Sequence, residues 1–99
     1  MERNTCILYS EVTDVYKKLL LFIPSKGFKV KESNEKYFFL RAKKNSIFFW
    51  RNLRLALHIQ SVEKKKVEIK IMLYKIGLRQ PKMEAEYIIE IEKFLESRR

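Results

Sequence analysis

The chain has 99 residues, of which 46% are hydrophobic and 13% aromatic, so it is too apolar to be a disordered tail. This length accommodates a single domain, residues 1–99, with one core, and excludes a second domain. The formal charge is +10, from 22 Lys and Arg against 12 Asp and Glu, and residues 1–81 carry +11 while residues 82–99 carry −1. A basic balance of this kind favours anionic partners, although it can also serve only solubility.

Cysteine use and hydropathy indicate where such a chain works. Cys6 is the single cysteine, which excludes an intrachain disulfide and indicates either a reducing compartment or simple indifference to redox. A Cys6–Cys6 link between chains stays open. No stretch approaches the roughly 20 apolar residues that span a bilayer. The polar start of the chain, residues 2–4, does not resemble a signal peptide. We therefore expect a cytoplasmic protein, of a host cell if it is viral, without membrane insertion.

The first part of the chain predicts an edge strand followed by a helix. Thr5–Tyr9 is rich in β-formers and lacks Gly and Pro. From Ser10 the apolar residues recur at helical spacing (Val12, Val15, Tyr16, Leu19 and Ile23). Ser10 or Thr13 is the expected N-cap, and Asp14 lies near the positive end of the helix. Pro24 should end or kink this helix, and Gly27 supplies the left-handed residue that often follows a helix.

Residues 28–40 predict a β-hairpin with a turn at Ser33, Asn34 and Glu35. This turn pairs Val30 with Phe38 and Phe28 with Leu40 on one face. The other face interleaves cations with aromatic rings, because it carries Lys29, Lys31, Tyr37, Phe39 and Arg41.

A polar turn at residues 43–46 precedes the apolar run Ile47, Phe48, Phe49 and Trp50. The run is too short for a helix, so we expect it to plug one end of the core. An exposed binding hot spot is the alternative.

A central hairpin organises the chain. Every second residue is aliphatic from Leu53 to Ile59 and again from Val67 to Leu73, which is the period of half-buried strands. Pairing centred on Lys64 places Leu55 opposite Leu73, Leu57 opposite Ile71 and Ile59 opposite Ile69. A slip of one residue would bury Arg54 and Lys70, so the register is strongly specified.

The last part of the chain predicts a loop and a helix. Gly77–Pro81 reads as a loop, and Pro81 suits the first turn of a helix. The inner stripe of this helix is Ile88, Ile91 and Leu95 with Tyr87 and Phe94, and its water-facing residues are Glu86, Glu90, Glu92, Lys93 and Glu96.

Together these elements predict an α+β fold, an antiparallel sheet with element order β-α-β-β-β-β-α and both helices on one face. The order resembles the TATA-binding-protein-like or helix-grip architecture, in which an antiparallel sheet curves around a C-terminal helix and leaves its other face open. The Lys- and Ile-rich, glycine-poor composition also resembles that of small proteins from viruses of thermoacidophilic archaea. The second resemblance implies a thermostable viral protein.

The residues for catalysis or cofactor binding are missing. With one His and one Cys, in different elements, neither a metal site nor acid–base chemistry is predicted, and His58 reads as a polar residue on the outer sheet face. No serine lies in a glycine-flanked elbow, and two glycines cannot build a phosphate-cradling loop. We therefore expect no enzyme, metal, cofactor or small-molecule substrate.

Two binding hypotheses remain for the open sheet face. The first is a nucleic-acid site that combines cations with stacking aromatic rings: Lys29, Lys31, Tyr37, Phe39, Arg41, Arg54, Lys64, Lys65, Lys66, Lys70 and Tyr74. Lys64–Lys66, at the hairpin tip, can alternatively be a solvated turn. The second is a homodimer interface whose apolar centre is Tyr37, Phe39, Ala56, Met72 and Tyr74, with the charge serving solubility.

Overall fold

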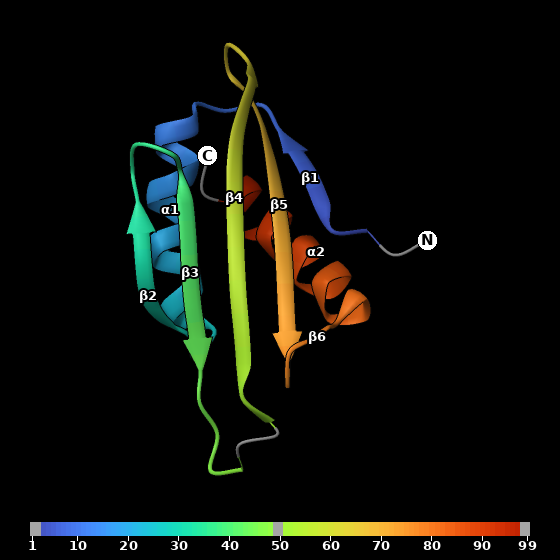
Figure 1. Cartoon of the computed structure of the whole chain (residues 1–99). Coiled ribbons are helices and arrows are strands. Elements are labelled where there is room, and N and C mark those ends of the chain that lie inside the picture. The colour runs from blue at the N-terminus through green and yellow to red at the C-terminus, as the bar shows by residue number, and fades with distance from the viewer. Residues whose placement is uncertain (1–2, 49–50, 98–99) are drawn as a thin grey trace.

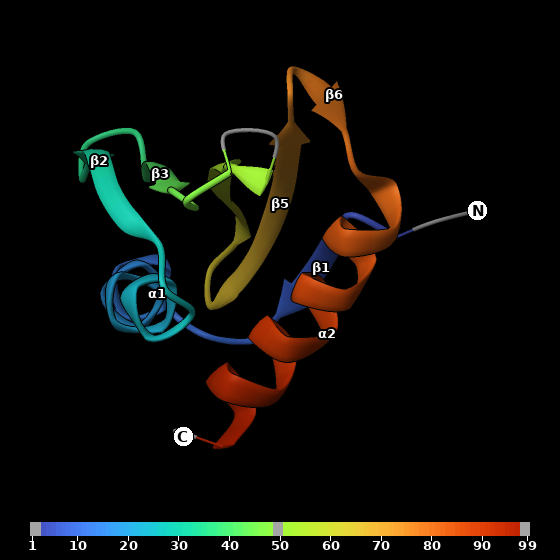
Figure 2. The same ribbon diagram turned by 90° about the horizontal axis from the view of Figure 1, so that it is seen from below.

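The computed structural model describes residues 3–48 and 51–97 and shows an α+β fold. The elements are β1 (Thr5–Leu8), α1 (Val12–Ser25), β2 (Lys29–Asn34), β3 (Phe39–Lys44), β4 (Leu53–Glu63), β5 (Lys66–Lys75), β6 (Leu78–Arg79) and α2 (Pro81–Ser97). The strands form one antiparallel sheet in the order β1-β5-β4-β3-β2, with β6 paired to β5 (Figure 1). Both helices cover the same face, α1 beside β2 and α2 beside β1 and β5 (Figure 2), so the predicted fold class is confirmed.

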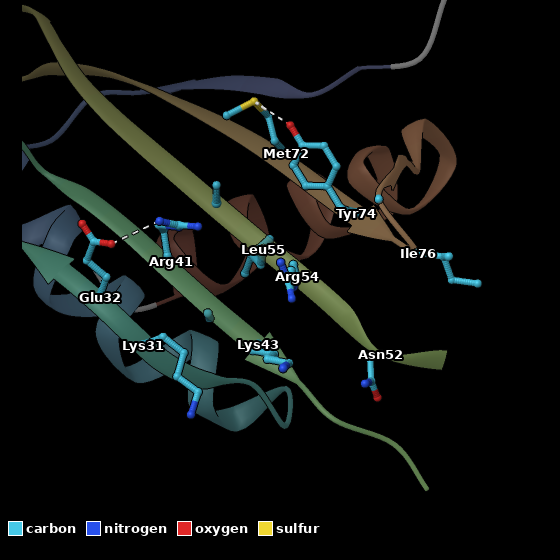
Figure 3. Close-up of a pocket in the computed structure, with 13 residues that line it drawn as sticks. Lys31, Glu32, Arg41, Lys43, Asn52, Arg54, Leu55, Met72, Tyr74 and Ile76 are labelled. Carbon is cyan, nitrogen blue, oxygen red and sulfur yellow. Dashed lines mark hydrogen bonds and ion pairs between the residues drawn. The ribbon is translucent and has the colours of Figure 1, made fainter. Parts of the chain in front are cut away.

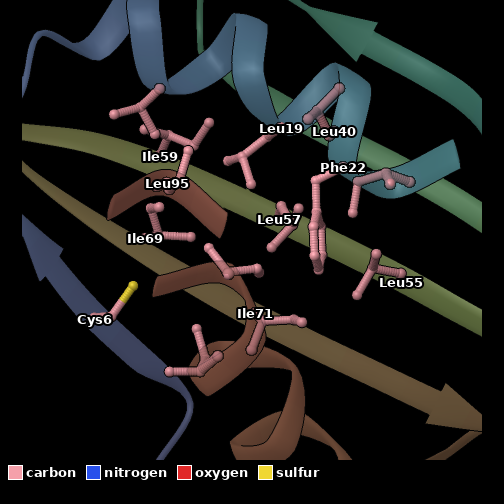
Figure 4. Packing of buried hydrophobic residues seen from close by; sticks show 14 of the residues in the cluster. Cys6, Leu19, Phe22, Leu40, Leu55, Leu57, Ile59, Ile69, Ile71 and Leu95 are labelled. Atoms are coloured by element: carbon pink, nitrogen blue, oxygen red, sulfur yellow. The ribbon is translucent and has the colours of Figure 1, made fainter. Parts of the chain in front are cut away.

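The central hairpin has the predicted register. Leu55 pairs with Leu73, Leu57 with Ile71 and Ile59 with Ile69. All six side chains are buried. Figure 4 shows Leu55, Leu57, Ile59, Ile69 and Ile71 on the side of the helices, because alternate residues of a strand point to the same face. Near the tip a bulge between Ser61 and Glu63 ends the regular pairing.

The helices fill the other side of this core. In α1 the buried residues include Val15, Leu19 and Ile23, and in α2 they include Ile88, Ile91 and Leu95, which confirms both predicted stripes. The rings of Phe22 and Phe94 join the two helices, with their centroids 5.3 Å apart. Tyr87 and Phe94 are only partly buried and pack at the margin of the core.

The ends of α1 differ in how well they were predicted. Neither Ser10 nor Thr13 is the N-cap; that position is Glu11, whose side chain makes no capping hydrogen bond, so this prediction is wrong. At the C-terminus Gly27 has the predicted left-handed conformation, with φ of +86°. The Gly27 N–H donates to the Pro24 carbonyl and the Phe28 N–H to the Ile23 carbonyl, which is a Schellman motif. The helix includes Pro24 and ends one residue later, at Ser25, close to where Pro24 was expected to end or kink it.

The β2–β3 hairpin has a different turn and register from those predicted. The side-chain oxygen of Asn34 accepts the N–H groups of Lys36 and Tyr37, and the turn occupies residues 35–38. Phe38 then packs its ring edge-on against Tyr16, with the centroids 5.7 Å apart. As a result Val30 pairs with Ala42 rather than with Phe38, and Lys29 faces Lys43. At Lys29 and Val30 the slip is an even number of residues, so both keep their predicted faces but acquire new neighbours. Beyond the bulge between Val30 and Glu32 the slip is odd, and Glu32 lies opposite Arg41 on the open face.

Ile47 and Phe48, in the segment between β3 and β4, do not plug the core. Ile47 is 96% exposed and Phe48 is also exposed, so the predicted core plug is wrong for these two residues. Phe49 and Trp50 lie outside the described residues. The predicted turn at residues 43–46 also begins too early, because Lys43 and Lys44 still belong to β3.

The carboxylate of Glu84 fills a gap along the edge of β5, between the two strands β1 and β6 that pair with this edge. The strand β1 covers one part of this edge and β6, which the sequence had predicted as loop, covers another. Between them the Leu73 N–H donates to Glu84 Oε2 at 2.8 Å, and Arg79 binds both carboxylate oxygens at 2.6 and 2.8 Å. Burial raises the pKa of Glu84, but these hydrogen bonds outweigh it, so the pKa lies below its ordinary value.

Candidate nucleic-acid interface

The open face of the sheet carries a line of cations that crosses the strands. The pairings Lys29–Lys43, Lys43–Arg54, Arg54–Tyr74 and Tyr74–Arg79 join successive strands. Directly paired residues share a face, and these positions alternate with the buried Ala42, Leu53, Leu55 and Leu73. We call Lys29, Lys43, Arg54, Tyr74 and Arg79 the basic row. With strands about 4.8 Å apart, the row is about 19 Å long.

The basic row places like charges directly opposite each other. Lys29 faces Lys43, and Lys43 faces Arg54, an arrangement that is unfavourable for the folded sheet. Within the part of the chain that the structure describes, none of these three cations forms an ion pair. Arg79 differs, because Glu84 binds it. The centre of the row therefore presents uncompensated positive charge to solvent.

The row borders a hollow of about 880 Å³ on the same face (Figure 3). Its charged lining residues are Lys31, Glu32, Arg41, Lys43 and Arg54. The single carboxylate among them, Glu32, is bound by Arg41 at 3.3 Å, so the lining has a net positive charge. A bulge between Val30 and Glu32 places two β2 residues opposite Arg41. Lys31 and Glu32 therefore both reach the hollow.

The far wall of the hollow is apolar. Ala56, Met72, Tyr74 and Ile76 line it from β4, β5 and the turn after β5. The Tyr74 hydroxyl donates to Met72 Sδ at 3.8 Å, and the Arg79 guanidinium lies 6.0 Å from the Tyr74 ring centroid. These contacts hold the Tyr74 ring against the sheet, so the hollow offers cations on one side and apolar surface on the other.

The structure brings together only part of the predicted nucleic-acid site. Lys31, Arg41, Arg54 and Tyr74 line the hollow, and Lys29 belongs to the basic row. Phe39 lies on the open face but packs near His58, with centroids 6.5 Å apart, and is four residues along β3 from Lys43, about 13 Å. Lys70 lies opposite His58, in the same distant part of the face.

The other predicted residues lie at the opposite end of the sheet from the hollow. Tyr37 is in the β2–β3 turn, with Lys36 Nζ 5.5 Å from its ring centroid, so the predicted strand position is wrong. Lys64 and Lys65 form the β4–β5 turn and Lys66 begins β5. Of the predicted dimer residues, Ala56, Met72 and Tyr74 line the hollow, while Tyr37 and Phe39 are separated from them.

Among the residues of the interface that the sequence did not predict are Lys43, Arg79 and Ile76. Lys43 was assigned to a turn, although the alternation of Phe39, Arg41 and Lys43 with Leu40 and Ala42 was visible in the sequence. Arg79 and Ile76 were missed because β6 has two residues, too few to show a period.

The described residues also bear on metal binding, thiol reactivity and membrane spanning. His58 is exposed on the outer face, as predicted, and residues 3–48 and 51–97 contain no group of three His, Cys, Asp or Glu that could hold a metal ion. Burial raises the pKa of the Cys6 thiol to about 11, against a smaller lowering by Arg3. No helix in the described part of the chain is long and apolar enough to cross a membrane.

Comparisons with known proteins do not add a function. No protein-family model matches the chain, and no curated protein matches it. The resemblances drawn from element order and composition stay predictions.

Proposed function

We propose that this chain is a non-enzymatic binding protein that holds nucleic acid on the open face of its sheet. The observation that carries the proposal is the basic row, in which Lys29, Lys43 and Arg54 face one another and form no ion pair with any residue that the structure describes. Like charges directly opposite each other destabilise a sheet, and functional sites are where proteins are expected to keep such unfavourable local arrangements. A bound polyanion would compensate the three charges.

The surroundings of the row support a long anionic ligand. Residues 36–62 and 69–83, which supply β3, all of β4 except Glu63 and most of β5, contain no Asp or Glu. The row extends past the hollow to Lys29 on β2, so a chain of phosphates fits it better than one compact anion does. Phosphates bound there would release condensed counterions, a favourable term that declines as salt rises.

Charge also favours nucleic acid over self-association through the same face. In a twofold-symmetric dimer each copy uses the same patch. Two copies packed face to face would bring the cations of both hollows together, with Glu32 as the single lining carboxylate of each. Such like-charge contact is strongly unfavourable, so a homodimer through Ala56, Met72 and Tyr74 is the weaker candidate.

The test compares two double variants with the same change in net charge. Lys43→Glu with Arg54→Glu reverses the centre of the row, and Lys64→Glu with Lys65→Glu reverses the distant turn. Affinity for labelled oligonucleotides is measured by fluorescence anisotropy over a range of salt. We expect the wild type to show a log-linear loss of affinity with salt, and the row variant to lose about 1.4 units of the slope on single strands, about 0.7 for each lost phosphate contact.

The turn variant should bind nearly as the wild type does. Equal weakening of both variants would mean that only the total charge matters, and absence of binding at low salt would refute the proposal.

A further inference from the structure

Ile76, in the turn between β5 and β6, is unusual in two ways: its backbone is left-handed, and its apolar side chain is exposed. Lys75 pairs with Leu78, which leaves a two-residue turn of Ile76 and Gly77 with φ of +53° and +75°. This is the type I′ pattern, in which Asn-Gly is preferred because both residues are left-handed. A β-branched residue is strained there. Ile76 is also 64% exposed, so burial of its side chain does not compensate the strain.

Ile76 occupies a specific place in the interface. It lines the hollow together with Met72 and Tyr74, whereas Lys31, Lys43 and Arg54 line it from the other strands (Figure 3). The hollow is therefore divided into a cationic side and an apolar side. A nucleotide with an unpaired base has the matching chemistry, since a phosphate can reach the cations while the flat base covers the apolar side. In a duplex the bases are stacked inside and present no free face.

We propose that Ile76, with Tyr74, forms an apolar clamp for an unpaired base and makes the site prefer single strands over duplexes. The inference rests on the proposed function, because it needs a phosphate backbone on the basic row. It explains why a strained, exposed isoleucine occupies a position where Asn would stabilise the turn: the side chain contacts the ligand. Its role is in specificity, and the cations supply affinity for any nucleic acid.

The decisive variant is Ile76→Asn, because Asn tolerates the left-handed conformation and should stabilise the turn. We expect its urea midpoint to rise above that of the wild type. Its affinity for a single-stranded oligonucleotide should fall about tenfold, while duplex affinity and the salt slope stay unchanged. The matched control is Ile47→Asn, which removes an even more exposed isoleucine from the β3–β4 loop, outside the lining of the hollow. This control should change neither stability nor preference.

The possible results separate the clamp from the proposed function. If Ile76→Asn keeps the single-strand preference, the clamp is refuted while salt-dependent binding stands. If it loses stability together with all binding, Ile76 is structural and the clamp is again refuted. If the wild type binds neither form, both proposals fail. Two further results would also overturn the clamp. In the first, the wild type co-sediments with phosphatidylserine vesicles and, of the two variants, only Ile76→Asn abolishes this. In the second, the wild type is a dimer that Ile76→Asn converts to a monomer.

Discussion

Glu84 offers the sharpest test of how this fold is held together. It is 1% exposed, and its carboxylate accepts hydrogen bonds from the Leu73 N–H and from Arg79. In Glu84→Ala the Leu73 N–H is left in the gap between β1 and β6 without its acceptor, which costs about 1–3 kcal/mol. The loss of the ion pair between Glu84 and Arg79 adds about 1 kcal/mol or less, because the Arg79 side chain is half-exposed and its guanidinium can hydrogen-bond to water instead. We therefore expect a total loss of about 1–4 kcal/mol.

Glu84→Gln separates the charge from the hydrogen bond. The amide oxygen can still accept the Leu73 N–H, so we expect a smaller loss of about 1–2 kcal/mol at pH 7. The pKa of Glu84 is lowered in the folded state. Its charge therefore stabilises the fold above the unfolded pKa, about 4.3, and this contribution is lost as the pH falls through the lower folded pKa. The stability gap between wild type and Glu84→Gln should narrow in that acid range.

The measurement is urea unfolding followed by circular dichroism, between pH 7 and pH 3. Glu86→Gln is the control, because Glu86 is an exposed carboxylate on the same helix, and it should change stability by less than about 0.5 kcal/mol. A Glu84→Gln protein as stable as the wild type at pH 7, or a gap that does not narrow with acid, would refute the reasoning.

Two more predictions concern the two faces of the sheet and the thiol. Leu57→Ala and Ile71→Ala remove fully buried side chains, so each should cost about 2–5 kcal/mol in urea unfolding, whereas Gln60→Ala on the open face should cost little. Equal costs on both faces would mean that the open face is covered in solution. Because Cys6 is buried and its pKa is raised to about 11, we expect it to react very slowly with a thiol reagent at pH 8 and rapidly in denaturant. Fast labelling of the folded protein would contradict this.

The sequence determined the elements whose signal is a long local period. Alternation over Leu53–Ile59 and Val67–Leu73 specified both strands and their register, since a slip of one residue would bury charged side chains. The stripe of Ile88, Ile91 and Leu95 specified α2 in the same way. Alternation also assigned Arg41, Arg54 and Tyr74 to the open face correctly, because the face of a strand residue depends only on its position in the period.

Tertiary structure decided which of these residues are neighbours. The Asn34 turn and the packing of Phe38 on Tyr16 shifted β2 against β3, and this shift placed Lys29 opposite Lys43 and left Tyr37 outside the strands. Likewise nothing local in the sequence marks Glu84 as buried, because its partner N–H belongs to Leu73 on another element. Periodicity is a property of one segment and can be read along the chain. Register and edge pairing are energy differences between segments, and only the folded core and the turns together select among them.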